Sequence, residues 1–163
     1  LSKRVDGLVI CDLHMPDQLW EDLAGGPIPV ATIGVETGLF DSVTIDNVAA
    51  AAEAVGHLLD LGHRRIGLIG AGPEASADNE SAALRRRGTI EALKARGLEL
   101  PPQLDVAGSF SVAGGKEAAF EILDRAAPTA VFCLSDEMAI GAMWAAGEAS
   151  LDEIGRASCR ERV

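Results

Sequence analysis

The stretch Thr129-Ala-Val-Phe-Cys-Leu-Ser-Asp-Glu-Met138 decides the fold. Its first six residues are almost all apolar and lack the alternation of a strand with one wet face, so they predict a strand that is buried on both faces. Ser135 and Asp136 are helix-capping residue types, and they predict a helix from Asp136 to about Ala149. A buried strand that leads directly into a helix is typical of a parallel sheet covered by helices.

The same order of strand and helix recurs towards the N-terminus. We expect strands at residues 5–10, 29–33, 42–45, 65–69 and 104–107, and helices at about 17–23, 47–61, 81–96 and 112–125. This alternation predicts the α/β class with parallel strands. Ligands of such open sheets bind beyond the carboxyl ends of the strands, so the loops at those ends are the candidate site.

Composition bounds the class of protein. The 163 residues are 48% hydrophobic, enough for one globular unit or two small lobes with a core. The net charge of −11 disfavours direct binding to a nucleic-acid backbone. No apolar run reaches the ~18 residues of a membrane-spanning helix, and no signal peptide is apparent. The cysteines, Cys11, Cys133 and Cys159, are far apart and odd in number, which favours a reducing compartment over a disulfide frame or a zinc site.

The last ten residues differ from the rest of the chain. Residues 154–163 carry three arginines and show neither helical nor alternating periodicity. Their back-translation, ATC GGA AGA GCG TCG TGT AGG GAA AGA GTG, resembles a common sequencing-adapter read. We therefore expect residues 153–163 to be a foreign tail, the alternative being a basic surface tail, and we assign no function to Arg156, Cys159 or Arg160.

Two patterns suggest other chemistry. Gly70-Ala71-Gly72 imitates a dinucleotide fingerprint, but polar residues delay the next helix, and no acid follows at the end of a second strand. A glycine-rich strand exit explains these residues as well. Cys11 and His14 share a loop and can mimic a thiol–imidazole nucleophile, yet no orienting group accompanies them. His14 remains a candidate ligand contact.

The other candidate residues lie near the carboxyl ends of three expected strands. Arg85 opens an arginine run on the helix after residues 65–69, and its fork of donors suits neighbouring sugar hydroxyls or a carboxylate. Phe110 can stack on the apolar face of a sugar ring, or it can simply fill its loop. Ser135 and Asp136 are explained by helix capping, and their position also puts two polar groups at the site.

These motifs together resemble the effector domain of the lactose-repressor family of transcription regulators. The resemblance covers about residues 5–150 and rests on an ordered set of motifs: Asp46-Asn47, residues 61–70, Arg85-Arg-Arg-Gly88, Ala92-Leu93 with Gly97, Phe110-Ser111 and residues 128–142. It implies a two-lobed, periplasmic-binding-protein-like α/β fold with a ligand cleft between the lobes. The lobes are expected at residues 1–45, a partial N-terminal lobe, and 46–152, the C-terminal lobe.

The resemblance also implies a function. Arg85 matches the arginine that binds effector hydroxyls, Phe110 the aromatic that flanks the sugar, and Asp136 an acid of the site. Ser135 stands where many members have Asn, and His14 lies in the variable ligand loop of the first lobe. The implied protein is a cytoplasmic regulator, not an enzyme. It binds a small-molecule effector, a sugar by family expectation, forms a homodimer, and contacts operator DNA through an N-terminal headpiece absent from this sequence.

Two other classes remain open from the sequence. A sugar-binding protein of a periplasmic transporter has the same fold without a DNA role. A nucleotide-dependent enzyme would use the loop at residues 70–75. We expect neither a cofactor nor a metal, and we expect a fragment of this kind to expose apolar strand edges and to aggregate.

Overall fold

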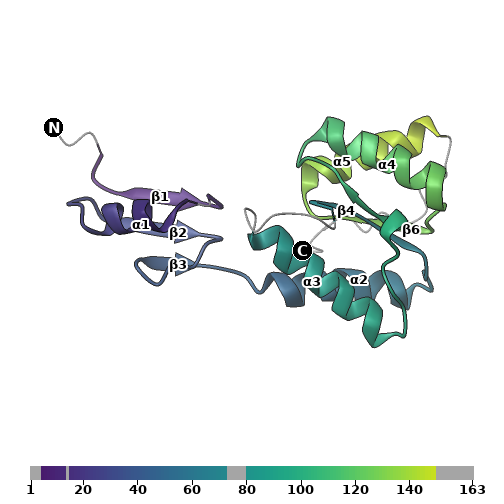
Figure 1. The fold of residues 1–163 in the computed structure, drawn as a ribbon, viewed down its shortest axis with the longest axis horizontal. Coiled ribbons are helices and arrows are strands. Elements are labelled where there is room, and N and C mark those ends of the chain that lie inside the picture. The colour runs from purple at the N-terminus through teal and green to yellow at the C-terminus, as the bar shows by residue number, and fades with distance from the viewer. Residues whose placement is uncertain (1–4, 14, 73–79, 150–163) are drawn as a thin grey trace, which may run out of the picture. The chain divides into compact units, whose positions relative to one another are not determined.

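The computed structural model describes residues 5–13, 15–72 and 80–149 (Figure 1). The expected tail at 153–163 and His14 therefore lie outside the described residues. The chain divides into two compact units, Leu1–Asp46 with Asp78–Ser81, and Asn47–Ala77 with Ala82–Val163.

The first unit is a three-stranded parallel sheet with a helix. Strands β1 (Leu8–Cys11), β2 (Val30–Ile33) and β3 (Asp41–Val43) lie in that order, and α1 (Asp17–Ala24) connects the first two. Trp20 of α1 is buried and meets the ring of Phe40 at a centroid distance of 6.1 Å. Phe40 is half-buried and directly precedes β3, so this ring contact links α1 to the start of that strand.

The second unit is a larger α/β layer structure. Its elements are α2 (Asn47–Asp60), β4 (Ile66–Gly70), α3 (Glu80–Ala95), the short 3-10 helix η1 (Pro102–Leu104), β5 (Asp105–Ala107), α4 (Val112–Ala126), β6 (Ala130–Cys133) and α5 (Asp136–Glu148). The parallel sheet has the order β5-β4-β6. Helices α2 and α3 cover one face, and α4 and α5 cover the other (Figure 1). All five residues of β4 are buried, as its apolar sequence predicts.

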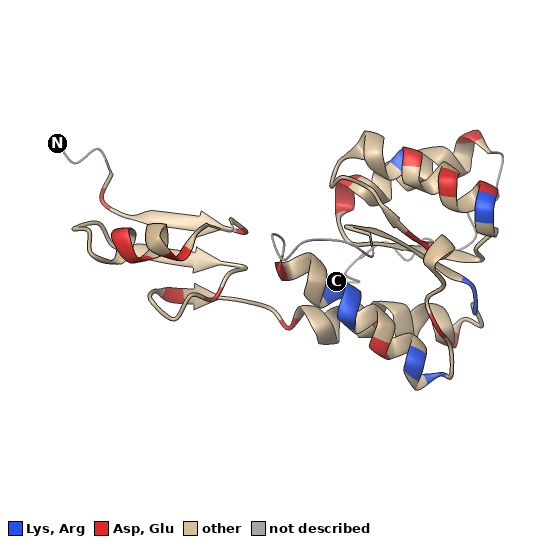
Figure 2. Ribbon diagram, in the orientation of Figure 1, with Lys and Arg blue, Asp and Glu red and all other residues tan. Residues whose placement is uncertain are grey.

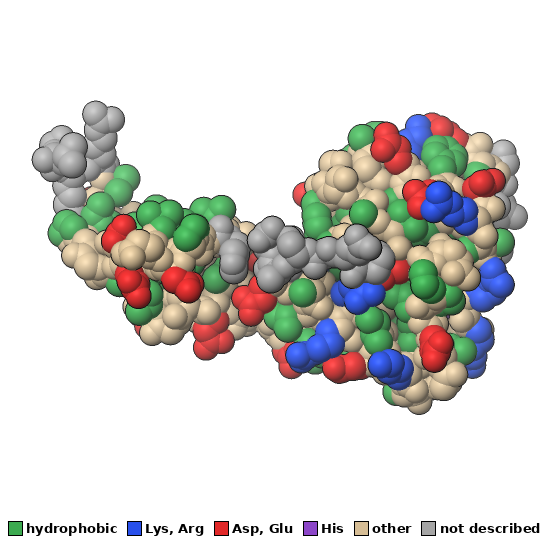
Figure 3. Space-filling model, in the orientation of Figure 1, with side chains coloured by type: hydrophobic (Ala, Val, Ile, Leu, Met, Phe, Trp, Pro, Cys, Tyr) green, Lys and Arg blue, Asp and Glu red, His purple; other side chains and the backbone are tan. Residues whose placement is uncertain are grey.

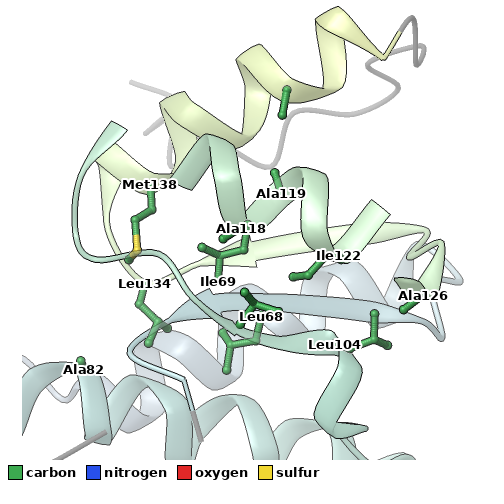
Figure 4. Close-up of a cluster of buried hydrophobic side chains, with 12 residues drawn as sticks. Leu68, Ile69, Ala82, Leu104, Ala118, Ala119, Ile122, Ala126, Leu134 and Met138 are labelled. Carbon is green, nitrogen blue, oxygen red and sulfur yellow. The ribbon is translucent and has the colours of Figure 1, made fainter. Parts of the chain in front are cut away.

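Two apolar clusters form the core of this unit. One contains Val55, Leu59, Ile66 and Leu93, from α2, β4 and α3. The other includes Ile69 of β4, Ile122 of α4 and Met138 of α5 (Figure 4). Helices α4 and α5 approach closely because glycines at their contact have no Cβ atom. A Cβ atom on Gly115 would overlap the backbone of Met138, and one on Gly141 would overlap the backbone of Val112 and Lys116.

The α/β class with parallel sheets is confirmed, and most differences are at element ends. β1 begins at Leu8 rather than at residue 5, because the pairing of β1 with β2 begins with Leu8 opposite Val30. Leu104, expected in a strand, belongs instead to η1, because Pro102 favours a helical turn at that point. Within the residues described, every helix is too short or too polar to cross a bilayer.

Candidate functional site

The carboxyl ends of β5 and β6 and the first half of α3 position the candidate residues of the second unit. Phe110 follows β5, Ser135 and Asp136 follow β6, and Arg85 lies in the second turn of α3. Because β5 and β6 both run parallel to β4, which lies between them, the two loops lie at the same edge of the sheet. The basic residues of α3 are coloured blue in Figure 2.

Arg85 is held by two hydrogen bonds from different elements. Its Nε donates to Oδ1 of Asn47 at 2.8 Å, and its Nη1 donates to the carbonyl oxygen of Leu134 at 2.7 Å. The side chain is half-buried, and Asn47 is 6% exposed. These contacts fix the plane of the guanidinium, and within the residues described Nη2 makes no hydrogen bond, so its two N–H donors point in a set direction. The bond to Leu134 places the group beside Ser135.

Gly88 explains the spacing Arg85-x-x-Gly88. A Cβ atom on Gly88 would overlap the carbonyl group of Val48. Residues three apart share one face of a helix, so Arg85 and Gly88 both face the start of α2. Glycine allows the two backbones to approach closely, and this approach brings Arg85 within reach of Asn47.

The loop that carries Phe110 has an unusual backbone. Ser109 and Phe110 both adopt left-handed conformations, with φ of 51° and 46°, which side chains with a Cβ atom rarely accept. The loop is fixed at its end because Ser111 caps α4 and accepts a hydrogen bond from the N–H of Gly114 at 3.0 Å. Phe110 keeps 36% of its surface exposed. Strain of this kind is typical of functional loops.

Ser135 begins α5, as its residue type predicts. Its hydroxyl oxygen accepts a hydrogen bond from the N–H of Met138 at 3.4 Å. The pKa of Glu137 is lowered because its carboxylate accepts a hydrogen bond from its own backbone N–H and another from the Ser135 hydroxyl. Asp136 is exposed in the first turn. The Ser135 hydroxyl thus has a structural role, and the Asp136 carboxylate is the more accessible of the two groups.

The alternative patterns gain no support from their surroundings. Gly70 lies against the Leu134 side chain, and Gly72 has φ of 78°, so packing and turn geometry account for both glycines. The first described helix after them, α3, begins only at Glu80. Cys11 is an exposed end of β1, and its proposed partner His14 is outside the described residues. Among the residues with a described placement, no group of three or more His, Cys, Asp or Glu is arranged to hold a metal.

A pocket of about 140 Å³ lies at the opposite end of the second unit. Arg64, Arg65 and Arg125 line it, and these side chains are exposed. Arg64 and Arg65 donate to the carbonyl oxygens of Leu59 and Ala126, the last turns of two helices. This pocket contains none of the predicted site residues. Its third arginine, Arg125, pairs with Glu121 of its own helix.

Sequence reasoning missed two partners of α3. The amide of Asn47 orients Arg85, and Asp105 forms a salt bridge with Arg86 at 2.6 Å. Asp105 is a single acidic residue at the start of a buried strand. A charged residue in an otherwise apolar strand indicates that a charged partner lies nearby, and this was the sequence signal that could have identified the pair.

The fold and this site define a class of ligand-binding domain. Residues 55–154 match the family described as "Periplasmic binding protein-like domain". The chain belongs to this family.

The relatives found are transcription regulators. The chain is 36% identical to the HTH-type transcriptional regulator DegA of Bacillus subtilis over 151 residues, 89% of this chain and 43% of DegA. It is 36% identical to the HTH-type transcriptional repressor CytR of Escherichia coli, covering 88% of this chain and 42% of CytR. The chain thus spans less than half the length of these relatives.

Solved structures give the same result. A LacI-family regulatory protein from Chloroflexus aggregans matches with a TM-score of 0.75 and 32% identity, covering 90% of this chain and 53% of that one. A complex titled "transcriptional regulator CelR-cellobiose complex" matches with a TM-score of 0.75 and 33% identity, covering 91% and 46%. These matches support the regulator interpretation over the transporter alternative, and these relatives are regulators rather than enzymes.

Proposed function

We propose that this chain is part of the effector-binding region of a LacI-family transcription regulator, and that its effector is a sugar. The observation that carries the proposal is the guanidinium of Arg85, which Asn47 and Leu134 hold while Nη2 makes no hydrogen bond within the described part of the chain. We place the two lobes at residues 1–45 and 46–152, and the division of the chain into two compact units near Asp46 supports this assignment. His14 remains a proposed effector contact from the first lobe.

The chemistry of the second unit suits a polyhydroxylated ring. The two donors on Nη2 of Arg85 suit oxygens of neighbouring hydroxyls. The exposed ring of Phe110 offers a flat apolar surface to the C–H face of a sugar. The carboxylate of Asp136 accepts hydrogen bonds from hydroxyl groups. Ser135 contributes mainly by directing the start of α5.

The intact protein acts through DNA. By family membership we infer a cytoplasmic homodimer that binds its operator through a separate headpiece and carries out no catalysis. The excess of acid in this chain fits that division of roles, because the basic DNA contacts belong to the headpiece. An effector that binds two lobe arrangements with different affinity shifts the affinity for DNA.

Calorimetric titration with a panel of aldopentoses, aldohexoses, disaccharides and nucleosides tests the proposal. We expect one class to bind. Arg85→Lys should then weaken its affinity at least about tenfold, because lysine offers a point charge in place of a fixed fork. Arg87→Lys is the matched control, since Arg87 is exposed and pairs with Glu91 on its own helix at 3.4 Å. Equal losses in both variants, or no binding by any class, would refute the proposal.

A further inference from the structure

The side chain next to Arg85 forms the most deeply buried salt bridge described in this chain. Nε and Nη2 of Arg86 donate to Oδ2 of Asp105 at 3.0 and 2.6 Å. The side chain of Asp105 is 2% exposed and that of Arg86 is 30% exposed. Oδ1 of Asp105 is buried and has no hydrogen-bond partner in the structure as described. The carboxylate therefore depends on α3 for its charge partner.

The two arginines anchor α3 to opposite edges of one sheet. Arg85 reaches the carbonyl group of Leu134, directly after β6, and Arg86 reaches Asp105 in β5. β4 lies between these strands. Successive residues of a helix point about 100° apart, so two anchors in a row determine the rotation of α3 about its axis. A helix rotated by either anchor would carry the other guanidinium away from its partner.

Stability alone does not account for this pair. Burial of two charges is costly, and apolar side chains of similar volume often serve as well or better. Here the cost is greater because Oδ1 of Asp105 is unsatisfied. A salt bridge differs from an apolar contact in its direction, since it holds only when donor and acceptor are aligned.

We propose that the Arg86–Asp105 salt bridge is a positioning pair that holds Arg85 in its observed geometry, with Nε on Asn47 and Nη1 on Leu134. Its consequence for a ligand rests on the proposed function, in which Arg85 binds the effector. The effect of the salt bridge on the ordering of Arg85 does not depend on the proposed function, and it is measurable in the chain without a ligand.

Exchange of the Arg85 Nε–H with solvent, followed by ¹⁵N NMR on the 163-residue chain, tests the proposal. Arg85→Lys assigns the signal. In the double variant Arg86→Met/Asp105→Leu, which leaves no buried charge, we expect Arg85 Nε–H exchange to accelerate by about tenfold, the factor for loss of one ordinary hydrogen bond. Asp105→Asn, which keeps the shape but not the charge, should show a smaller acceleration. Asp60→Asn is the control, because it removes the salt bridge between Asp60 and Arg96, the residue that directly follows α3.

The backbone N–H of Thr89, in the next turn of α3, separates positioning from general loosening. Acceleration at Arg85 with an unchanged rate at Thr89 and an unchanged unfolding midpoint supports the proposal. An unchanged rate at Arg85, or equal acceleration at Thr89 or in Asp60→Asn, overturns it. Failure of every sugar to bind would refute the proposed function, but the exchange rate of Arg85 would still test the positioning role of the salt bridge, because it is measured without a ligand.

Discussion

At the scale of the residue, several candidate side chains of the site also make hydrogen bonds that stabilise the fold. Two nitrogens of Arg85 donate hydrogen bonds, one to Asn47 and one to Leu134, and Ser135 caps α5. Such fixation lowers the conformational entropy that a ligand must remove on binding. The same reasoning makes Phe110 informative, because its backbone is strained while its ring is exposed.

Replacement of Phe110 by glycine should separate stability from binding. Phe110→Gly removes the left-handed strain, so we expect the free energy of unfolding to stay equal or rise by up to about 1 kcal/mol in spite of glycine's entropy. Sugar affinity should fall at least about fivefold through loss of stacking. Ser109→Gly is the matched control, with the same strain and no ring, and should leave affinity unchanged. A large loss of stability in Phe110→Gly would show that the ring is a core residue.

Cys133 predicts a pH dependence. Burial at the end of β6 raises the pKa of its thiol from 9.0 to about 12. Above pH 9 the unfolded chain loses this proton and the folded chain keeps it, so stability falls as pH rises from about 9 towards 12 and is unaffected below 9. The slope reaches at most about 1.4 kcal/mol per pH unit.

Urea unfolding at several pH values between about 8 and 10.5 measures this slope. The chain has no tyrosine to titrate in this range. Cys133→Ala should lose the extra slope, and Cys11→Ser, at an exposed strand end, should keep it. Identical slopes in the two variants would contradict the prediction.

The sequence predicted these residues unevenly. Phe110, Ser135 and Asp136 could be placed just after strands because apolar runs show roughly where strands lie, and Arg85 could be placed near the start of a helix. The partners of α3 could not, because Asn47 is 38 residues from Arg85 and Asp105 is 19 residues from Arg86. Only the packed helix brings them together.

At the scale of the element, glycine determines how the helices pack. The helical patterns gave the extents of α2 to α5 to within about one residue, since periodicity and the glycine after a helix are local signals. Strand ends were less certain because pairing with a neighbour fixes them, as with Leu8 opposite Val30. The close approach of α4 and α5 is likewise invisible in either helix alone.

Two glycines of α5 predict opposite effects of one substitution. Gly141→Ala forces a Cβ atom into the backbone of α4, so we expect a loss of about 1–3 kcal/mol in the free energy of unfolding. Gly147→Ala meets no atom within 4 Å, and we expect a gain of up to about 1 kcal/mol from lower chain entropy. Chemical denaturation of both variants tests this. A loss in Gly147→Ala, or none in Gly141→Ala, would show that α4 and α5 are not packed as described.

At the scale of the whole molecule, the two units differ in how well they bury their apolar residues. β4 of the second unit is fully buried. In the first unit Val9 is 61% exposed, Val43 68% and Ile45 64%, and apolar side chains are visible on its surface (Figure 3). A small unit that buries little apolar surface has little to offset its conformational entropy. The first unit should therefore open more often than the second.

Hydrogen exchange at two matched amides tests this difference. Thr32 and Leu68 are both buried residues in the central strand of a three-stranded parallel sheet, so static access of solvent is similar for both. Their protection then reports the stability of the unit rather than local exposure. We expect the protection factor of Thr32 to be at least about a hundredfold lower than that of Leu68. Equal protection would mean that the two units unfold as one and that the exposed apolar surface of the first costs no stability.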